Sequence, residues 1–101
     1  MAYINVGSRF TEKDLDKAQR VADKTFHLTI HAGLKVALKK GLSVLKDSTP
    51  WIACPQGIRK TIMVEKELKD TILTLAKDNN INCDHVVYTL IQLGFEELLN
   101  D

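Results

Sequence analysis

The chain has 101 residues and a formal net charge of +1; 45% of its residues are hydrophobic and 27% are charged. This length is enough for one compact domain, and the composition is that of a folded globular protein rather than a disordered one. The N-terminus lacks the basic start and apolar run of a signal peptide, and no apolar stretch approaches the roughly 20 residues that span a bilayer. We therefore expect an intracellular, cytoplasmic protein with no membrane partner.

Charge is unevenly distributed along the chain. Residues 1–47 carry nine basic and five acidic side chains, a net charge of +4, whereas residues 48–101 carry five and eight, a net charge of −3. The small total excludes binding of nucleic acid through overall charge alone, so a DNA contact would need local positive charge and backbone amides. Cys54 and Cys83 form no C-x-x-C pair, and the sequence lacks four spaced zinc ligands, so we expect reduced thiols, no metal and no cofactor.

Two short segments alternate between apolar and polar residues. Residues 3–10, YINVGSRF, and residues 58–64, IRKTIMV, place apolar side chains at every second position. A period of two is typical of a half-buried β-strand. Ser8 and Lys60 are the polar exceptions on the apolar sides of these two segments.

Two amphipathic helices are expected after the first strand. Thr11 is a good N-cap, and Asp14 stands three residues later, where a capping box has its acid. The apolar stripe of this helix extends towards Phe26. Thr29 caps a second helix, which should run to about Lys46.

The second half repeats this order. Residues 65–79 have helical apolar spacing, Asn79 and Asn80 form a plausible stop, and Asn82 caps a last helix that runs to about Leu99.

The two halves superpose at a nearly constant offset. Phe10 maps to Val64 at 54 residues and Gly41 maps to Gly94 at 53, which one extra residue in the first turn between helices explains. A glycine inside a helix costs about 1 kcal/mol relative to alanine, so its repetition predicts a close approach of two helices. One strand with two helices leaves open strand edges, so we expect two copies to pair their strands antiparallel in a single domain, residues 1–101.

The segment between the repeats breaks every period. Residues 47–57, DSTPWIACPQG, hold both prolines and are predicted to link a first unit, residues 1–46, to a second, residues 58–101. Trp51 and Ile52 are expected to pack over the edge of the core.

Strand, helix and capped helix in this order resemble the ribbon-helix-helix (Arc/MetJ/CopG) superfamily. The resemblance lies in RKTIMVEKELKDTILTLAKDNNINCDHVVYTLIQLGFEEL and in the weaker copy INVGSRFTEKDLDKAQRVADKTFHLTIHAGLKVALKKGL, about four fifths of the chain. Most members have one unit per chain and dimerise, whereas two units in one chain are similar to tandem regulators of archaeal viruses. The resemblance implies an α+β, mostly α fold: a pseudodimer with a two-stranded antiparallel ribbon and four helices.

The resemblance also implies a function. Such proteins are transcriptional regulators, repressors or activators, that bind double-stranded DNA sequence-specifically by placing the ribbon in the major groove. One pseudodimer reads only a short site, so a homodimer or higher homo-oligomer along the DNA is expected.

The outward side chains of the ribbon are the predicted base readers. Arginine suits guanine, asparagine suits adenine and methionine can touch thymine methyls. Glycine departs from the family's polar readers, and indicates a close backbone approach to DNA or an unused position. The alternative is a solvated polar strand face. The six positions are Asn5, Gly7, Arg9, Arg59, Thr61 and Met63.

Phosphate contacts are predicted from two strand side chains and from the N-terminal amides of the second helix of each unit. Asp84 is awkward there because its carboxylate would repel phosphate, so a capping role is favoured for it. The predicted positions are Tyr3, Lys60, Thr29, Ile30, His31, Asn82 and Cys83.

Other functions have less support in the sequence. His27 and His31 straddle a turn without a third ligand nearby, and no nucleophile-elbow, phosphate-loop or paired-carboxylate motif occurs, so an enzyme is not expected. A protein–protein interaction module of the same fold, which does not read DNA, remains the alternative. The salt dependence of duplex binding separates the two functions.

Overall fold

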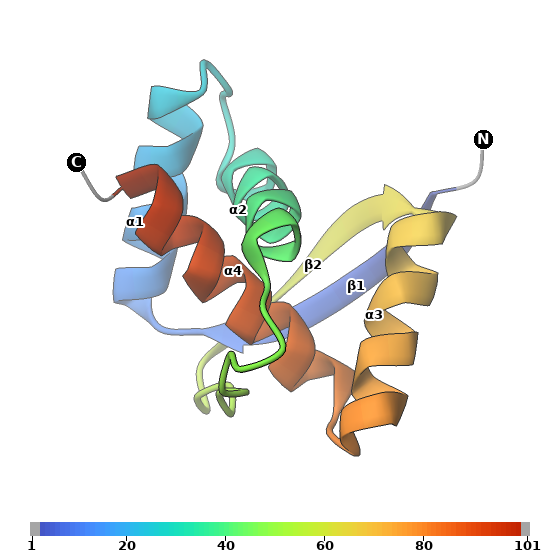
Figure 1. Ribbon diagram of the computed structural model, residues 1–101. Helices are drawn as coiled ribbons and strands as arrows, with labels where there is room; N and C mark the ends of the chain where they lie inside the picture. Colours follow the sequence, from blue (N-terminus) through green and yellow to red (C-terminus); the bar gives the residue numbers. More distant parts are fainter. Residues whose placement is uncertain (1–2, 100–101) are drawn as a thin grey trace.

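The computed structural model describes residues 3–99, which form two strands and four helices (Figure 1). The expected α+β, mostly helical class with a two-stranded antiparallel sheet is confirmed. In chain order the elements are β1 (Tyr3–Phe10), α1 (Glu12–Lys24), α2 (Ile30–Val44), β2 (Ile58–Glu65), α3 (Lys66–Asn79) and α4 (Cys83–Leu99).

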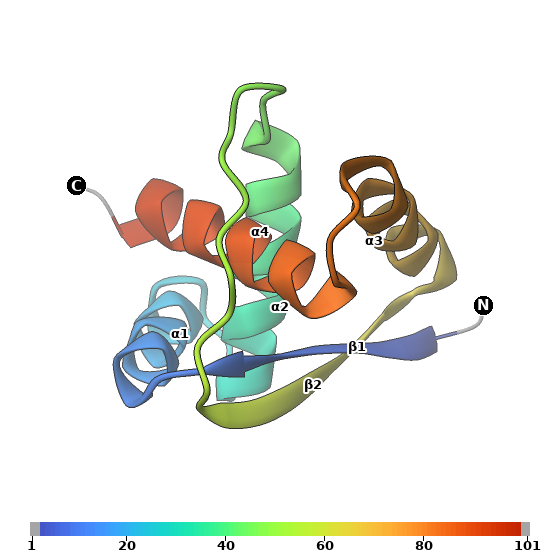
Figure 2. The ribbon, with the colours of Figure 1, turned by 90° about the horizontal axis from the view of Figure 1, so that it is seen from below.

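The two strands pair with each other in one antiparallel register. Tyr3 lies opposite Glu65, Gly7 opposite Thr61 and Phe10 opposite Ile58. The second strand is one residue longer than predicted, because Glu65 continues the extended backbone and α3 begins at Lys66. Figure 2 shows the helices on one side of the ribbon, so the ribbon has a helix-facing side and an outer side.

The helix-facing side of the ribbon contributes to one hydrophobic core. Val6 and Phe10 of β1 and Ile62 and Val64 of β2 are buried there, as the period of two predicts. The helices complete this core with apolar side chains from their inner stripes: Ala18, Val21, Leu34, Ala37, Leu38, Ile72, Ala76, Val86, Val87, Leu90, Ile91 and Phe95.

The crossing of α2 and α4 depends on two glycines. A Cβ atom at Gly41 would stand 1.7 Å from the carbonyl oxygen of Leu90, and one at Gly94 would stand 1.9 Å from that of Ala37. No real atom fits at these distances, so the two backbones touch where each helix lacks a side chain. The predicted close approach is confirmed, and the contact is reciprocal: each helix inserts its glycine against the other helix.

We expect Gly94→Ala to destabilise the protein by about 2 kcal/mol. The new methyl group must push two backbones apart, which costs about 1–3 kcal/mol in a packed core and outweighs the better helix propensity of alanine. Denaturant unfolding measures the change. Thr74→Ala, at an exposed position of α3, is the control and should change the stability little; a Gly94→Ala protein more stable than the wild type would contradict the close contact.

The helix starts follow the predicted capping chemistry. The Thr11 side chain accepts a hydrogen bond from the backbone amide of Asp14, whose carboxylate accepts one from the backbone amide of Thr11, so the capping box is present. Thr29 accepts from the backbone amide of Ala32 in the same way. These bonds satisfy amides that have no partner within the helix.

The two turns between helices share one geometry and differ in sequence. Asn80 ends α3 with a left-handed backbone at φ 54°, and Phe26 has φ 61° just after α1. In both turns the next residue donates its amide to an alanine carbonyl, His27 to Ala22 and Ile81 to Ala76. The prediction that Phe26 joins the apolar stripe was wrong: its side chain is 95% exposed.

The extra residue of the first half lies just after this turn. It is Leu28, between His27 and the helix cap Thr29, whereas Ile81 directly precedes Asn82 in the second half. The Leu28 side chain is 93% exposed.

Replacing Phe26 with asparagine should stabilise the fold by about 1 kcal/mol. A left-handed backbone costs most residues about 1–2 kcal/mol, and asparagine tolerates it. Thermal or denaturant unfolding tests this. Leu28→Asn removes an equally exposed apolar side chain outside the left-handed position and should leave the stability unchanged. A loss of stability in Phe26→Asn would contradict the strain.

The linker follows an extended path along α4 (Figure 2). The backbone amide of Ile52 donates to the Thr89 hydroxyl at 2.8 Å, and the amide of Cys54 donates to Nδ1 of His85 at 3.0 Å. Trp51 packs against the core as predicted. Ile52 is 45% exposed, and its packing over the edge of the core stays a prediction.

Candidate nucleic-acid interface

The outer side of the ribbon brings the six predicted base-reading positions together. Asn5 lies opposite Met63, Gly7 opposite Thr61 and Arg9 opposite Arg59, so the positions form three cross-strand pairs in a row. Gly7 is buried, and the other five residues are exposed. Met63 has an exposed fraction of 60%.

Two arginines stand opposite each other at one end of this row. Like charges on directly paired strand positions destabilise a sheet. The structure separates them: Arg9 Nη1 donates to the carbonyl of Gly57 at 3.2 Å, and Arg59 Nη1 binds the Asp84 carboxylate at 3.0 Å. At this end of the row the strands themselves carry no acid, and the compensating charge for Arg59 comes from Asp84 of α4.

The centre of the row is occupied by Gly7 and Thr61. The Arg59 guanidinium lies over Gly7, because a Cβ atom there would be 3.1 Å from Arg59 Nη2 and 3.2 Å from the Thr61 methyl group. Gly7 therefore makes room for a neighbouring side chain, a role that the sequence alone did not indicate.

The other end of the row carries Tyr3 and Glu65. The carboxylate of Glu65 lies 3.3 Å from Lys39 Nζ and 3.9 Å from Lys35 Nζ, and Lys35 also lies 5.5 Å from the centre of the Tyr3 ring. A hydrogen bond from its own backbone amide lowers the pKa of Glu65, and the hydrogen bond from Lys39 lowers it further. The carboxylate thus stays ionised, and two lysines of α2 balance it.

Sequence reasoning missed Glu65, Lys35 and Lys39 at this end. Glu65 continues the alternation of Arg59, Thr61 and Met63, which was the signal available, but it was assigned to the predicted helix over residues 65–79 instead. The two lysines were not visible as partners, because only the fold brings α2 beside β2.

Lys60 lies on the helix-facing side, opposite Ser8, and is half-buried. Its ammonium would have to pass the edge of the ribbon to reach a phosphate. Ser8 is fully buried, and its hydroxyl donates to the backbone carbonyl of Asp84 at 2.7 Å. The two polar exceptions of the sequence pattern are thus explained differently. Ser8 hydrogen-bonds β1 to the start of α4, whereas Lys60 is only half-buried near the edge of the ribbon.

The N-terminus of α2 has the composition predicted for an anion contact. Thr29 and His31 are exposed and Ile30 is half-buried, and the first turn contains no acidic residue. The backbone amides of a first helical turn carry partial positive charge, which favours phosphate.

The N-terminus of α4 differs from that of α2. The Asn82 side chain accepts from the backbone amide of Asp84 at 3.0 Å, which confirms Asn82 as the cap, and Cys83 is half-buried. The capping role favoured for Asp84 was wrong, since its carboxylate instead pairs with Arg59. The acid lies at the helix end where phosphate was predicted to bind.

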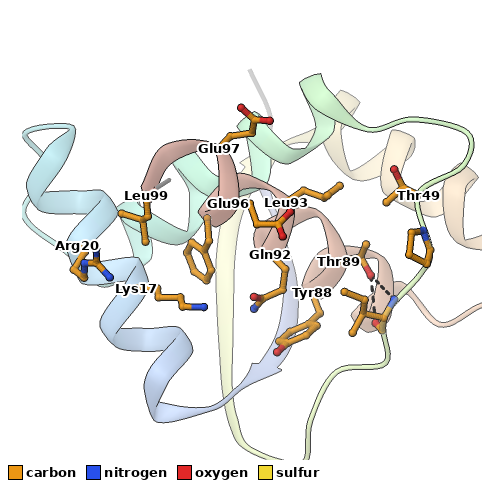
Figure 3. Close-up of a pocket in the computed structure, with 13 residues that line it drawn as sticks. Lys17, Arg20, Thr49, Tyr88, Thr89, Gln92, Leu93, Glu96, Glu97 and Leu99 are labelled. Atoms are coloured by element: carbon orange, nitrogen blue, oxygen red, sulfur yellow. Dashed lines mark hydrogen bonds between the residues drawn. The ribbon is translucent and has the colours of Figure 1, made fainter. Parts of the chain in front are cut away.

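A groove of about 1050 Å³ lies on a different part of the molecule, between α1 and the linker, over α4 (Figure 3). Buried Asp14 accepts hydrogen bonds there from Tyr88 Oη at 3.1 Å and Gln92 Nε2 at 2.9 Å. Burial raises the pKa of Tyr88 to about 12, and the Asp14 carboxylate adds to the shift. The Tyr88 hydroxyl therefore stays protonated and donates to Asp14. Together with Gln92 it holds α1 to α4, so these three side chains have a structural role.

Among residues 3–99, the structure shows no cluster of three or more potential metal ligands, and none of the helices is long and apolar enough to cross a membrane. No family model matches the chain, and no curated protein or solved structure does either.

Proposed function

We propose that the chain is a tandem ribbon-helix-helix pseudodimer that binds double-stranded DNA sequence-specifically and regulates transcription, with the outer side of the ribbon in the major groove. The observation that carries the proposal is the exposed row of paired side chains on that side. A two-stranded ribbon fits the major groove, where each base pair offers a distinct pattern of donors and acceptors.

The register supports the pseudodimer. The two halves correspond at an offset of 54 residues in the strands, so Gly7 corresponds to Thr61, and these two residues face each other at the ribbon centre. Equivalent positions meet in this way where a two-fold axis passes through a ribbon. The contacts of Gly41 with Leu90 and of Gly94 with Ala37 fit the same axis. At the offset of 53 residues Gly41 corresponds to Gly94 and Ala37 to Leu90, so the two-fold axis turns one contact into the other.

The side chains of the row have chemistry suited to bases. Arg9 and Arg59 suit guanine, Asn5 suits adenine, and Met63 and the Thr61 methyl group suit thymine methyls. Phosphate contacts come from the amides at the start of α2. With a net charge of +1, affinity for one short site is expected to be limited, so homodimers or larger assemblies on adjacent sites belong to the proposal.

A protein-interaction module is the second candidate. Phe26 and Leu28 favour it, because both side chains are almost fully exposed at the turn between α1 and α2 and exposed apolar groups often mark protein contacts. This turn is not part of the ribbon, so the two candidates concern different surfaces. DNA binding predicts a steep fall in affinity with salt, because phosphate contacts release counterions.

Selection from a random duplex pool tests the proposed function, followed by titration on the selected duplex and on a shuffled duplex of equal composition. Asn5→Ala should cost about 1–3 kcal/mol on the selected duplex and much less on the shuffled one, because the amide contacts a base edge. Asn79→Ala, at an exposed position of α3, is the matched control. Absence of any enriched sequence, or equal small losses on both duplexes, would count against base reading.

A further inference from the structure

The side chain of Arg59 crosses the neighbouring strand to reach α4. It starts on β2, its Nη2 lies over Gly7 of β1, and its Nη1 donates to Asp84 at the start of α4 with an N–O distance of 3.0 Å. The Arg59 side chain is 47% exposed and that of Asp84 is 29% exposed. The guanidinium is thus fixed at one end and open to solvent on the outer side of the ribbon.

The backbone of Asp84 is held in place by hydrogen bonds to two side chains. Its carbonyl accepts from the buried hydroxyl of Ser8, and its amide donates to the side chain of Asn82. Since Ser8 belongs to β1, the backbone of Asp84, which carries the carboxylate, is anchored to the strand that Arg59 crosses. A carboxylate positioned in this way can orient a guanidinium instead of moving with it.

Gly7 permits this path. A Cβ atom there would lie 3.0 Å from the carbonyl oxygen of Lys60, 3.1 Å from Arg59 Nη2 and 3.2 Å from the Thr61 methyl group. A Cβ atom at this position would crowd the guanidinium, which would have to shift by a few tenths of an ångström, and a longer side chain would need more of the same space. The absence of a polar reader at Gly7 is therefore compensated by Arg59, whose charged group occupies the space above it.

We infer that Asp84 is a positioning residue that fixes Arg59 above Gly7 for recognition of a guanine at the centre of the site; this inference rests on the proposed function. The ion pair uses Nη1 and leaves the donors of Nη2 and Nε for the two guanine acceptors, O6 and N7. An arginine held before binding loses less rotamer freedom when DNA arrives, and this strengthens the specific complex.

The same carboxylate makes the two units unequal. At the start of α4 it opposes a phosphate, whereas the first turn of α2 has no acid. The second unit accordingly contributes a base contact through Arg59 and the first unit contributes the phosphate contact. Removal of the Asp84 charge therefore has opposite effects on general affinity and on sequence discrimination.

Asp84→Asn tests the inference on two probes: a duplex selected by the wild-type protein from a random pool and a shuffled duplex of equal composition. Binding to the shuffled duplex should tighten about twofold because a negative charge is lost near phosphates. The ratio of the two affinities should fall threefold to tenfold because Arg59 is no longer held. Gly7→Ala, which crowds the guanidinium while the carboxylate remains, should lower the ratio by a smaller factor.

Asp70→Asn is the matched control, because it removes an exposed carboxylate from α3 and should leave the ratio unchanged. In an Arg59→Lys background, where the ratio is already low, Asp84→Asn should change it less than twofold. Circular dichroism verifies that each variant is folded. An Asp84→Asn ratio equal to that of the wild type, or higher, overturns the positioning role while the proposed function stands; a wild-type protein that selects no duplex overturns both.

Discussion

Antiparallel pairing of β1 with β2 is the interaction on which the rest of the structure depends. The strands are separated by 47 residues of chain, yet within residues 3–99 they form the whole sheet, and each strand has the other as its only strand partner. A two-stranded ribbon alone is marginally stable in water, so its apolar side must be covered. The helices provide that cover, and the uncovered side becomes a row of exposed side chains in fixed register.

The crossing of α2 and α4 makes this cover possible. Both helices pack centrally over the ribbon, and Gly41 and Gly94 allow their backbones to touch. The linker fastens to α4 through Thr89 and His85 and leads the chain back to β2. The helix–helix contact thus helps to hold the paired strands in place, so disruption of that contact should also disturb the ribbon.

Most of the fold could be predicted from the sequence because its signals are local. The period of two marks both strands, threonines at residues 11 and 29 mark helix starts, and the repeated glycine predicts the helix crossing. Phe26 was mispredicted because its apolar character fits a helical stripe, whereas the turn geometry places it in a left-handed backbone. No short-range pattern distinguishes these two outcomes.

The candidate site was predictable only in part. Alternation gave the outer positions, but the partners of those residues come from distant elements: Asp84 of α4 for Arg59, and Lys35 and Lys39 of α2 for Glu65. Such ion pairs depend on tertiary placement, which periodicity does not encode. The role of Gly7 was hidden for the same reason, since it is defined by a side chain of the opposite strand.

We propose that the outer side of the ribbon is the surface that meets DNA. Mapping of backbone amide NMR shifts during titration of the full chain with its selected duplex tests this most directly. The account predicts the largest changes at residues 5–9 and 59–63, with further changes at the start of α2. Changes concentrated in the groove between α1 and the linker, or at the turn around Phe26, with an unaffected ribbon, would contradict it.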